Sequence, residues 1–490
     1  MKKVSKVLSI LLSVVLVISS FYLLYQVIRL NVLPSKFLFP LTIGVVVLDA
    51  IFILLLIYFS KNVVSKIICI VLTLFICVAS CMGGYYISKT QGALSNITNV
   101  AKHAKNTVSV IVKESSSIKN KSQLNGVSVG SLRLNEQGSK KVLKELSSEG
   151  IVLNQTEYDS MTALLEAFYN GEVDSIIINE SSRSQILDME AYSNFDSNTR
   201  VVYQTSYKVK NNDSATSVSD ITSKPFNVLI SGSDTRGGFD ENGRSDVIMI
   251  ATVNPKTHTI LLTSVPRDFY VTTACDAGDG CMQGALDKIT HTGIHGTNTT
   301  KRTVEQLLGI EINYTFKVGF DTVTELVDIL GGVDVYVEPG YATTTSEFSV
   351  HEGVNHLNAQ QALAFARERY SYTEGDRQRT KNQQQVLMGI VKEATKPSVI
   401  TNYAAIMDTM ANTFSTTMSN AEITDLIKYQ LNNNPTWKME QYMVDGTGDT
   451  LMCAELGDAA SVMVPDQSTV KMAKDKINAV LAGKSSEDVK

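Results

Sequence analysis

The fold of the large C-terminal region is decided by residues 226–265, FNVLISGSDTRGGFDENGRSDVIMIATVNPKTHTILLTSV. Three apolar runs, 226–230, 246–253 and 259–265, are separated there by a polar, glycine-rich loop and by the short turn NPKTH. Short apolar runs bounded by turn residues predict strands, and their close spacing predicts an antiparallel meander. In such a meander the end of the first strand, the start of the second and the end of the third lie at one edge of the sheet.

That edge carries two acids and two arginines, which are Asp234, Arg244, Asp246 and Arg267. Carboxylate oxygens are the ligands that Mg²⁺ prefers, and guanidinium groups bind phosphate oxygens in pairs. The set predicts a phosphate site bridged by a metal ion. Taken singly, the same charges also fit solvated ion pairs at strand ends, which contribute little energy.

A second group of charges follows in residues 356–383, HLNAQQALAFARERYSYTEGDRQRTKNQ. The pattern predicts one helix capped by Asn358 and another that begins at Asp376. The polar side chains of interest in these two helices and their junction are Arg367, Arg369, Arg379 and Gln383. Arg379 and Gln383 follow Asp376 at i+3 and i+7, so all three share one helical face and can meet one ligand. A solvated basic face is the alternative interpretation.

The N-terminal region, residues 1–90, predicts a membrane anchor. Three apolar runs, at about 7–28, 37–59 and 66–87, each approach the roughly 20 residues that a membrane-spanning helix needs. Five basic residues flank the side of the N-terminus and three flank the opposite side, which places the N-terminus inside and the 400-residue remainder outside the cell. Asp49 lies within the second run, where we expect a protonated or hydroxyl-paired acid.

Charge is divided unevenly along the chain. Residues 1–90 hold eight Lys and Arg against one acid, while the rest of the chain has a net charge of −12. An acidic body lacks the positive surface that nucleic acids require, so we expect no nucleic-acid partner. Cys275 and Cys281 enclose the short turn CDAGDGC and predict a local disulfide, as expected for an exported region; a metal site is the weaker alternative because further ligands at suitable spacing are missing.

The exported part divides into two units. Residues 100–210 alternate β-rich and helical runs and predict a small accessory α/β domain, with a helix that stops at Gly171 before a buried strand. Residues 211–224 have the composition of a linker, and 225–485 form the larger domain. Ser128 lies in a GxSxG pattern, but within a β-run, so we do not expect it to be a nucleophile.

The histidines give no metal motif. HEGVNH, at 351–356, is one residue longer than the HExxH motif of zinc proteases, and His291 and His295 lie in a glycine-containing stretch that predicts a turn. We therefore expect no zinc at either pair.

Four segments together resemble the LytR-CpsA-Psr family of cell-wall phosphotransferases over about residues 222–485. They are GSDTRGGFDENGRSDVIMIATVNPKTHTILLTSVPRDFYV, DKITHTGIHG, LLGIEINYTFKVGFDTVTELVDILGGVDVYV and FARERYSYTEGDRQRTKNQ. The three-span anchor and the accessory domain look like the capsule-associated branch. The resemblance implies a mixed α/β domain with a central sheet and a tunnel for a polyprenyl chain, with the lipid diphosphate at its mouth.

Family members transfer an anionic glycopolymer (capsule, teichoic acid or a related polymer) from a polyprenyl diphosphate to the 6-hydroxyl of N-acetylmuramic acid in peptidoglycan, using Mg²⁺. The resemblance implies that Asp234 and Asp246 hold the metal. The implied diphosphate-binding residues are Arg244, Arg267, Lys288, Arg367, Arg369, Arg379 and Gln383, with Lys301 as an alternative to Lys288. The implied catalytic residues are Asp246, Arg267, Asp376 and Arg379. Asp246 or Asp376 could deprotonate the acceptor, and the sequence does not choose between them.

Three other functions fit the same residues. A lipid diphosphatase would admit water in place of a sugar hydroxyl. A non-catalytic receptor for polyprenyl phosphates would bind the lipid without turnover. A membrane-tethered transcription regulator would need the large domain inside the cell, which the charge, the cysteines and the predicted topology oppose. The sequence indicates neither the polymer nor the oligomeric state.

Overall fold

The structure is a computed structural model that describes residues 2–59, 62–98, 103–133, 136–233, 241–276, 280–396 and 399–490. Asp234, which the sequence predicts to be a metal ligand, lies outside the described residues. The chain forms two compact units. One unit combines Met1–Thr98 with Val391–Asn412 and Ser419–Thr436, and the other holds the rest of the chain.

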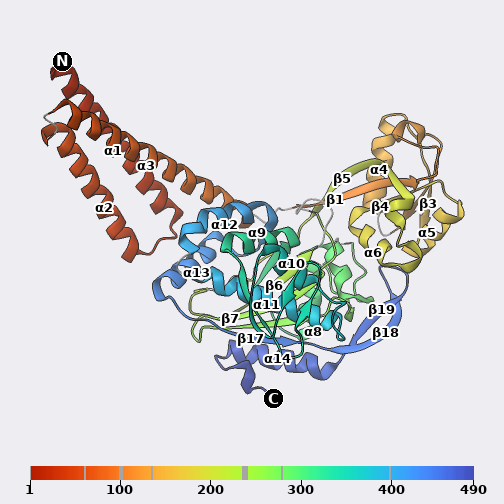
Figure 1. The fold of residues 1–490 in the computed structure, drawn as a ribbon. Coiled ribbons are helices and arrows are strands. Elements are labelled where there is room, and N and C mark those ends of the chain that lie inside the picture. Colours follow the sequence, from red (N-terminus) through yellow and green to blue (C-terminus); the bar gives the residue numbers. More distant parts are fainter. Residues whose placement is uncertain are drawn as a thin grey trace. The chain divides into compact units, whose positions relative to one another are not determined.

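The first unit contains three helices that are long and apolar enough to cross a membrane, as the sequence predicts. They are α1 (Lys2–Leu30), α2 (Ser35–Leu54, continued by a π-helical turn over Leu55–Phe59) and α3 (Val63–Thr98). Helices α1 and α3 lie side by side (Figure 1). The Ser20 hydroxyl on α1 donates a hydrogen bond of 2.9 Å to Oδ1 of Asp49 on α2, so the acid in the second span is paired with a hydroxyl.

Two later helices belong to the same unit. Helices α12 (Val399–Thr413) and α13 (Asn420–Asn433) come from the sequence range that we assigned to the larger domain. Nζ of Lys89 lies 2.8 Å from a carboxylate oxygen of Asp408 on α12. Nζ of Lys428 on α13 donates to Oδ1 of Asn31 at 2.8 Å. The anchor unit is therefore built from three separate segments of the chain.

The accessory domain contains a five-stranded mixed sheet with strand order β3-β2-β4-β1-β5 (Figure 1). Its strands are β1 (His103–Lys113), β2 (Ser128–Leu132), β3 (Asn154–Tyr158), β4 (Ser175–Asn179) and β5 (Thr199–Lys210). Its helices are α4 (Glu136–Ser148), α5 (Met161–Asn170), α6 (Arg183–Asp188) and α7 (Phe195–Asn198). Gly171 ends α5 with a left-handed φ of 81°, and β4 follows, as predicted. The Ser128 hydroxyl at the start of β2 donates to Asp174 at 2.6 Å.

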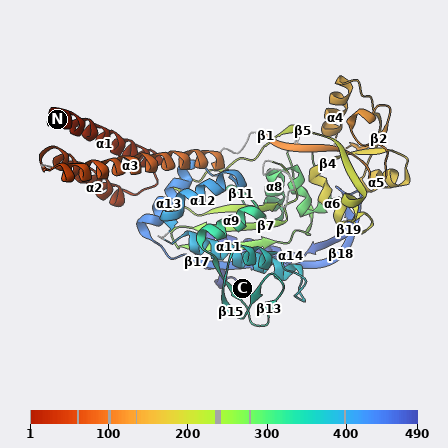
Figure 2. The same ribbon diagram turned by 45° about the horizontal axis from the view of Figure 1, so that its top comes forward.

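The larger domain is built on a six-stranded sheet with strand order β16-β11-β6-β7-β8-β17. Three of these strands, β7, β11 and β17, are labelled in Figure 2. The strands are β6 (Phe226–Ser233), β7 (Val247–Asn254), β8 (Thr259–Val265), β11 (Tyr314–Gly319), β16 (Phe414–Thr416) and β17 (Lys438–Met443). Strands β6, β7 and β8 form the predicted antiparallel meander, while β11 and β17 pair in parallel at its two sides.

Helices cover both faces of this sheet. On one face, Leu229, Ile250 and Leu261 pack in one hydrophobic core with residues of α8 (Thr297–Leu308) and α14 (Gln467–Leu481). The other face is covered by α9 (Phe320–Leu330), α10 (Ala359–Arg367) and α11 (Asp376–Ala394), which pack around strands β12 (Val333–Val337) and β15 (Gly353–Leu357). Side chains alternate between the faces because the strand repeat is two residues. The mixed α/β class is thus confirmed.

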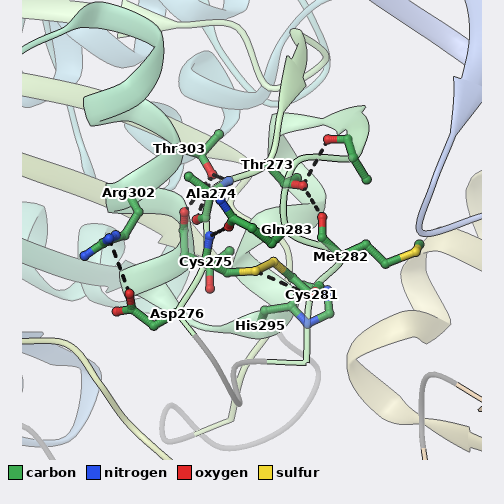
Figure 3. The surroundings of a disulfide bond; sticks show 12 residues. Thr273, Ala274, Cys275, Asp276, Cys281, Met282, Gln283, His295, Arg302 and Thr303 are labelled. Atoms are coloured by element: carbon green, nitrogen blue, oxygen red, sulfur yellow. Dashed lines mark hydrogen bonds and ion pairs between the residues drawn. A yellow bond between two sulfur atoms is a disulfide. The ribbon is translucent and has the colours of Figure 1, made fainter.

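A disulfide joins Cys275 to Cys281 in the loop between β9 (Tyr270–Thr272) and β10 (Leu286–Lys288) (Figure 3). The backbone N–H of Cys275 donates to Oε1 of Gln283 at 2.5 Å, and Arg302 of α8 pairs with Asp276 at 3.3 Å. The bridge therefore closes a short turn that is tied to α8.

Candidate active site

Asp246 ends the loop 241–246 and directly precedes β7. Its backbone N–H donates to the carbonyl of Gly232 at the end of β6, at 2.8 Å. The N–H of Ser245 donates to the carbonyl of Thr290 at 3.0 Å. The loop is thus held from two directions at the edge of the sheet, which fixes the backbone from which the Asp246 carboxylate projects.

The 3₁₀ helix Ile289–His295 approaches this loop so closely that only glycine fits at one position. A Cβ added to Gly293 would lie 2.5 Å from the carbonyl oxygen of Gly243 and 2.5 Å from the backbone nitrogen of Ser245. Both are backbone atoms that cannot rotate away. The glycine therefore permits the close contact that supports the loop.

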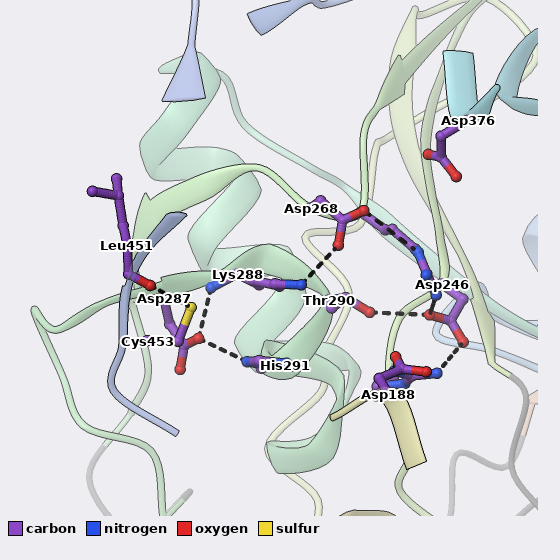
Figure 4. Close-up of polar contacts among 12 residues, drawn as sticks. Asp188, Asp246, Asp268, Asp287, Lys288, Thr290, His291, Asp376, Leu451 and Cys453 are labelled. Carbon is purple, nitrogen blue, oxygen red and sulfur yellow. Dashed lines mark hydrogen bonds and ion pairs between the residues drawn. The ribbon is translucent and has the colours of Figure 1, made fainter. Parts of the chain in front are cut away.

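The Asp246 carboxylate is surrounded by cationic and hydroxyl groups. Nη1 of Arg267 donates to Oδ1 of Asp246 at 2.9 Å, and the Thr290 hydroxyl, which points toward Asp246 in Figure 4, donates to the same oxygen at 3.2 Å. Oδ2 lies 3.8 Å from Nη2 of Arg244, beyond hydrogen-bonding distance. Burial by itself would raise the pKa of Asp246, but Arg244 and Arg267 hold that pKa below its ordinary value. Asp246 is therefore ionised at neutral pH.

Arg267 follows β8 and connects Asp246 to a second acid. Its Nε lies 3.8 Å from Oδ2 of Asp268, and Lys288 donates to Oδ1 of Asp268 at 3.3 Å (Figure 4). Lys288 thus pairs with Asp268. It is not among the described residues that line the polar pocket around Asp246 and Arg267. The alternative cation, Lys301, is buried and donates to the carbonyl of Ser214 at 3.0 Å.

The junction of α10 and α11 supplies the remaining arginines. Asn358 caps α10 by accepting from the N–H of Gln361 at 3.0 Å, as predicted. Arg367 ends α10, and Arg369 follows with its guanidinium 4.7 Å from the ring centre of Tyr370. Asp376 begins α11 and forms an ion pair with Arg379 one turn later.

These elements enclose a polar pocket of about 780 Å³. Seven residues that the sequence singled out line it: Arg244, Asp246, Arg267, Arg367, Arg369, Arg379 and Gln383. Three acids also line it: Asp188, Glu347 and Glu368. Asp376 is not among the lining residues, although it pairs with Arg379, which is. The structure therefore brings together residues from the beginning and the middle of the larger domain, more than 130 positions apart in sequence.

The pocket is suited to anions. The Nε atoms of Arg244, Arg267 and Arg379 are buried and have no hydrogen-bond partner among the described residues. Burial and the neighbouring charges of Arg267 and Arg369 hold the pKa of Arg379 below its ordinary value, although Asp376 opposes that shift. Buried donors without partners are rare in folded proteins, and like charges repel unless an anion lies between them. A phosphate bound between the arginines would accept hydrogen bonds from these donors and would reduce the repulsion between their charges.

An apolar cavity of about 80 Å³ adjoins the polar pocket. Leu363 of α10 and Gln383 of α11 line both spaces. The apolar one lies between the sheet, at Ile230 and Met249, and the helices, with Val386 among the lining residues. The charged pocket therefore lies next to an apolar cavity, an arrangement that suits a ligand with one anionic and one apolar part. The long polyprenyl tunnel that the resemblance implies stays a prediction, since this cavity, lined by described residues, holds about 80 Å³.

Of the two predicted metal ligands, the structure describes Asp246, while Asp234 lies outside the described residues. Mg²⁺ bound to phosphates takes one or two protein carboxylates and completes its shell with phosphate oxygens and water. The Oδ2 atom of Asp246 accepts no hydrogen bond among the described residues, so it fits that part. Among the described residues, no group of three or more His, Cys, Asp or Glu side chains is arranged to hold a metal ion, and His291 pairs with Asp287 at 2.7 Å.

Sequence reasoning missed three residues of this site. The signal for Thr290 was its position two residues after Lys288, because a hydroxyl group there lies in the same turn as Lys288. Asp268 could have been noted as the neighbour of Arg267. Asp188 belongs to the accessory domain, and no local pattern connects it with the larger domain. Its place at the pocket is visible only in the structure.

The fold and the site define an α/β protein with three helices that fit a membrane anchor and with an arginine-rich pocket. The family model described as LytR_cpsA_psr matches residues 191–479, and the chain belongs to this LytR-CpsA-Psr family. The match begins within the accessory domain and ends in α14.

Several curated relatives are named polyisoprenyl-teichoic acid–peptidoglycan teichoic acid transferase TagU. TagU of Bacillus cereus strain AH820 is 31% identical over 241 residues, which cover 49% of this chain and 76% of the relative. TagU of Bacillus subtilis strain 168 is 35% identical over 196 residues, 40% of this chain and 60% of the relative. The crystal structure of Bacillus subtilis TagU aligns with 28% identity and a TM-score of 0.41, covering 53% of this chain and 97% of that structure.

Proposed function

We propose that this protein is a transferase that moves an anionic glycopolymer from a polyprenyl-diphosphate carrier to peptidoglycan. One observation carries the proposal: five arginines line a pocket that shares Leu363 and Gln383 with an apolar cavity. A prenyl diphosphate has the same two halves, one anionic and one apolar. The family membership and the names of the TagU relatives support the same reaction class.

The arginines would bind and orient the diphosphate. Breaking a diphosphate leaves negative charge on the departing lipid phosphate, and fixed donors in a pocket with little water stabilise that charge in the transition state. Arg244, Arg267 and Arg379 are largely buried, with side chains 11%, 17% and 14% exposed, which makes these three the strongest candidates for this role. Asp246 holds Arg267 in place through the 2.9 Å hydrogen bond. The reaction needs no covalent intermediate on the protein.

The acceptor, which we propose to be the 6-hydroxyl of N-acetylmuramic acid, must lose a proton. A good general base has a pKa near the working pH. The lowered pKa of Asp246 makes that carboxylate a weak base, so we assign it to orienting Arg267 and leave proton removal to another group, such as Asp376. Asp376 would act from the margin of the pocket, beside Arg379.

We propose Mg²⁺ as the cofactor, held by Asp246 and Asp234 together with phosphate oxygens. Bound there, the ion would neutralise charge on the diphosphate. The cavity beyond Leu363 would take the first part of the lipid tail. Because the three apolar helices fit a membrane anchor, the carrier lipid and the site would share one membrane surface, on the outer side of the cell.

The test is mass spectrometry of the full-length protein in detergent, incubated with a short saccharide on a prenyl diphosphate, peptidoglycan fragments and Mg²⁺. We expect a new muramyl sugar-phosphate adduct that disappears when EDTA replaces Mg²⁺. Free sugar phosphate without an adduct would favour the diphosphatase. Intact lipid that stays bound and unreacted would favour the non-catalytic receptor.

A further inference from the structure

The accessory domain contributes an acid to the candidate site. Asp188, the last residue of α6, lies near Asp246 (Figure 4). It pairs through Oδ2 with Nη1 of Arg244, and both side chains line the polar pocket. The Arg244 side chain is 11% exposed, whereas that of Asp188 is 56% exposed. The carboxylate therefore approaches a buried guanidinium from the open side of the pocket, where a phosphate would also approach.

The accessory domain also contacts the other end of the loop that carries Arg244. Nζ of Lys105 on β1 lies 3.2 Å from Glu241, and the Thr107 hydroxyl donates to the same carboxylate at 2.5 Å. Glu241 begins the loop 241–246 and its side chain is buried. The loop is thus tied to the accessory domain at two points, Glu241 and Arg244 itself.

The helix that bears Asp188 is fixed against the larger domain. Met189, the next residue, packs against a hydrophobic cluster that includes Cys453 and Leu456 of the β18–β19 hairpin (Gly446–Cys453 and Asp458–Pro465). The N–H of Met161 donates to the carbonyl of Leu456 at 3.2 Å. These contacts hold α6 beside the pocket, so the pairing of Asp188 with Arg244 does not depend on one exposed side chain alone.

We propose that Asp188 sets the affinity of the site for phosphate by occupying Arg244 whenever no phosphate is bound. A phosphate carries more charge than a carboxylate. It can also accept from a guanidinium with two oxygens, whereas Asp188 pairs with Arg244 through Oδ2, so phosphate can displace Asp188. Replacing Asp188 by phosphate at Arg244 costs little free energy, because an ion pair with one exposed partner contributes little to stability. The inference rests on the proposed function in one respect, that the pocket binds phosphate.

The experiment measures the binding of inorganic pyrophosphate to the full-length protein in detergent by calorimetry. In Asp188→Asn, the competing charge is removed, and we expect pyrophosphate to bind about three- to fivefold more tightly, the size of an exposed ion pair. The gain should shrink at high ionic strength, because salt screens charges in contact with water. Asp188→Glu keeps a carboxylate and should bind as the wild type does.

Two controls separate this effect from a change in overall charge. Asp159→Asn removes the same charge from the accessory domain, where Asp159 pairs with Arg133 and does not line the pocket, and should leave binding unchanged. In an Arg244→Gln background, Asp188→Asn should have no further effect, since the acid acts through that arginine.

The outcomes distinguish this inference from the proposed function. If the wild type binds pyrophosphate and Asp188→Asn binds it equally or more weakly, Asp188 does not compete for Arg244, and only this inference fails. If neither the wild type nor Asp188→Asn binds pyrophosphate, the pocket is no phosphate site, and the proposed function fails with it. Equal tightening in Asp159→Asn would assign the gain to net charge and would also overturn the inference.

Discussion

At the residue scale, the site is a set of charges that depend on one another. Asp246 lies between Arg244 and Arg267, Arg267 also lies near Asp268, and Asp268 accepts from Lys288. Removing any one of these side chains leaves its partners with unbalanced charge. In a partly buried setting, an unbalanced charge destabilises the protein more than it would at the surface. Lys288 thus balances the charge of Asp268, which also lies near Arg267.

Arg267→Ala should reduce the transfer rate by about 100- to 1,000-fold, the usual loss when one preorganised donor to a developing charge is removed. Arg267→Lys should recover little of it, because an ammonium cannot hold Asp246 and a phosphate with the fixed geometry of a guanidinium. The rate of adduct formation by mass spectrometry measures both. Arg302→Ala is the matched control, since Arg302 pairs with Asp276 at the disulfide turn. Wild-type rates in Arg267→Ala would remove Arg267 from the proposed mechanism.

At the element scale, the site depends on close contacts between segments that carry no reacting group. The 3₁₀ helix Ile289–His295 supports the loop 241–246 through backbone contacts at Gly293 and through the Thr290 hydroxyl. The edge strand β17 is held in turn by Glu440, whose carboxylate accepts from Ser485 at 2.7 Å and from the N–H of Ser486 at 2.8 Å. We expect substitutions at Gly293 and at Glu440 to have different effects.

Gly293→Ala should displace the loop that carries Arg244 and Asp246. The added Cβ would meet backbone atoms at 2.5 Å, and overpacking of this kind costs about 1–3 kcal/mol. We expect a lower melting temperature and a transfer rate that falls further than the stability loss explains. Gly448→Ala, in the β18 strand, has no atom within 4 Å of the new Cβ and serves as the control. Normal activity in Gly293→Ala would show that the loop tolerates the shift.

Glu440→Gln should change how stability depends on pH. Burial would raise the pKa of Glu440, but hydrogen bonds from Lys438, Ser486 and Ser485 lower it to about 2. A carboxyl whose pKa is lowered by folding stabilises the protein above its ordinary pKa of 4.5, and that stabilisation is lost as the pH falls toward 2. The wild type should therefore lose on the order of 2 kcal/mol over this interval that Glu440→Gln does not lose.

The single tryptophan of the chain, Trp437, directly precedes β17 and reports its unfolding by fluorescence. Glu487→Gln is the control, because Glu487 is an exposed partner of Lys438 and its side chain lies outside the buried network. Parallel pH profiles for the wild type and Glu440→Gln between pH 4.5 and 2 would contradict the assignment.

At the scale of the whole molecule, local pattern predicts the sheet but not all that surrounds it. The meander and its charged edge follow from strand spacing, because antiparallel neighbours bring alternate strand ends together. The position of Asp188 at the pocket and the pairing of Glu241 with Lys105 depend on the contact between the accessory domain and the larger domain. Local sequence periodicity does not encode such a contact. The grouping of α12 and α13 with the anchor is missed for the same reason, since both helices lie within residues 225–485, which we assigned to the larger domain.

The predicted topology places the large region outside the cell, and a tag after Lys490 tests it. On intact cells, added protease should remove the tag, while a cytoplasmic reporter in the same cells stays whole. The physical basis is the small excess of basic residues on the side of the N-terminus. A tag that survives until the cells are lysed would place the pocket inside, away from peptidoglycan, and would contradict the proposed transfer.

The discontinuous anchor unit has a consequence for how the chain folds. Its first segment ends at Thr98 and its second begins at Val391, so roughly 290 residues must be synthesised between them. The apolar helices leave the ribosome first, yet their companions α12 and α13 arrive only near the end of synthesis, and contacts so distant in sequence form slowly. A fragment that lacks the first segment would leave both late helices without their native neighbours, and we expect it to aggregate more readily than the full chain.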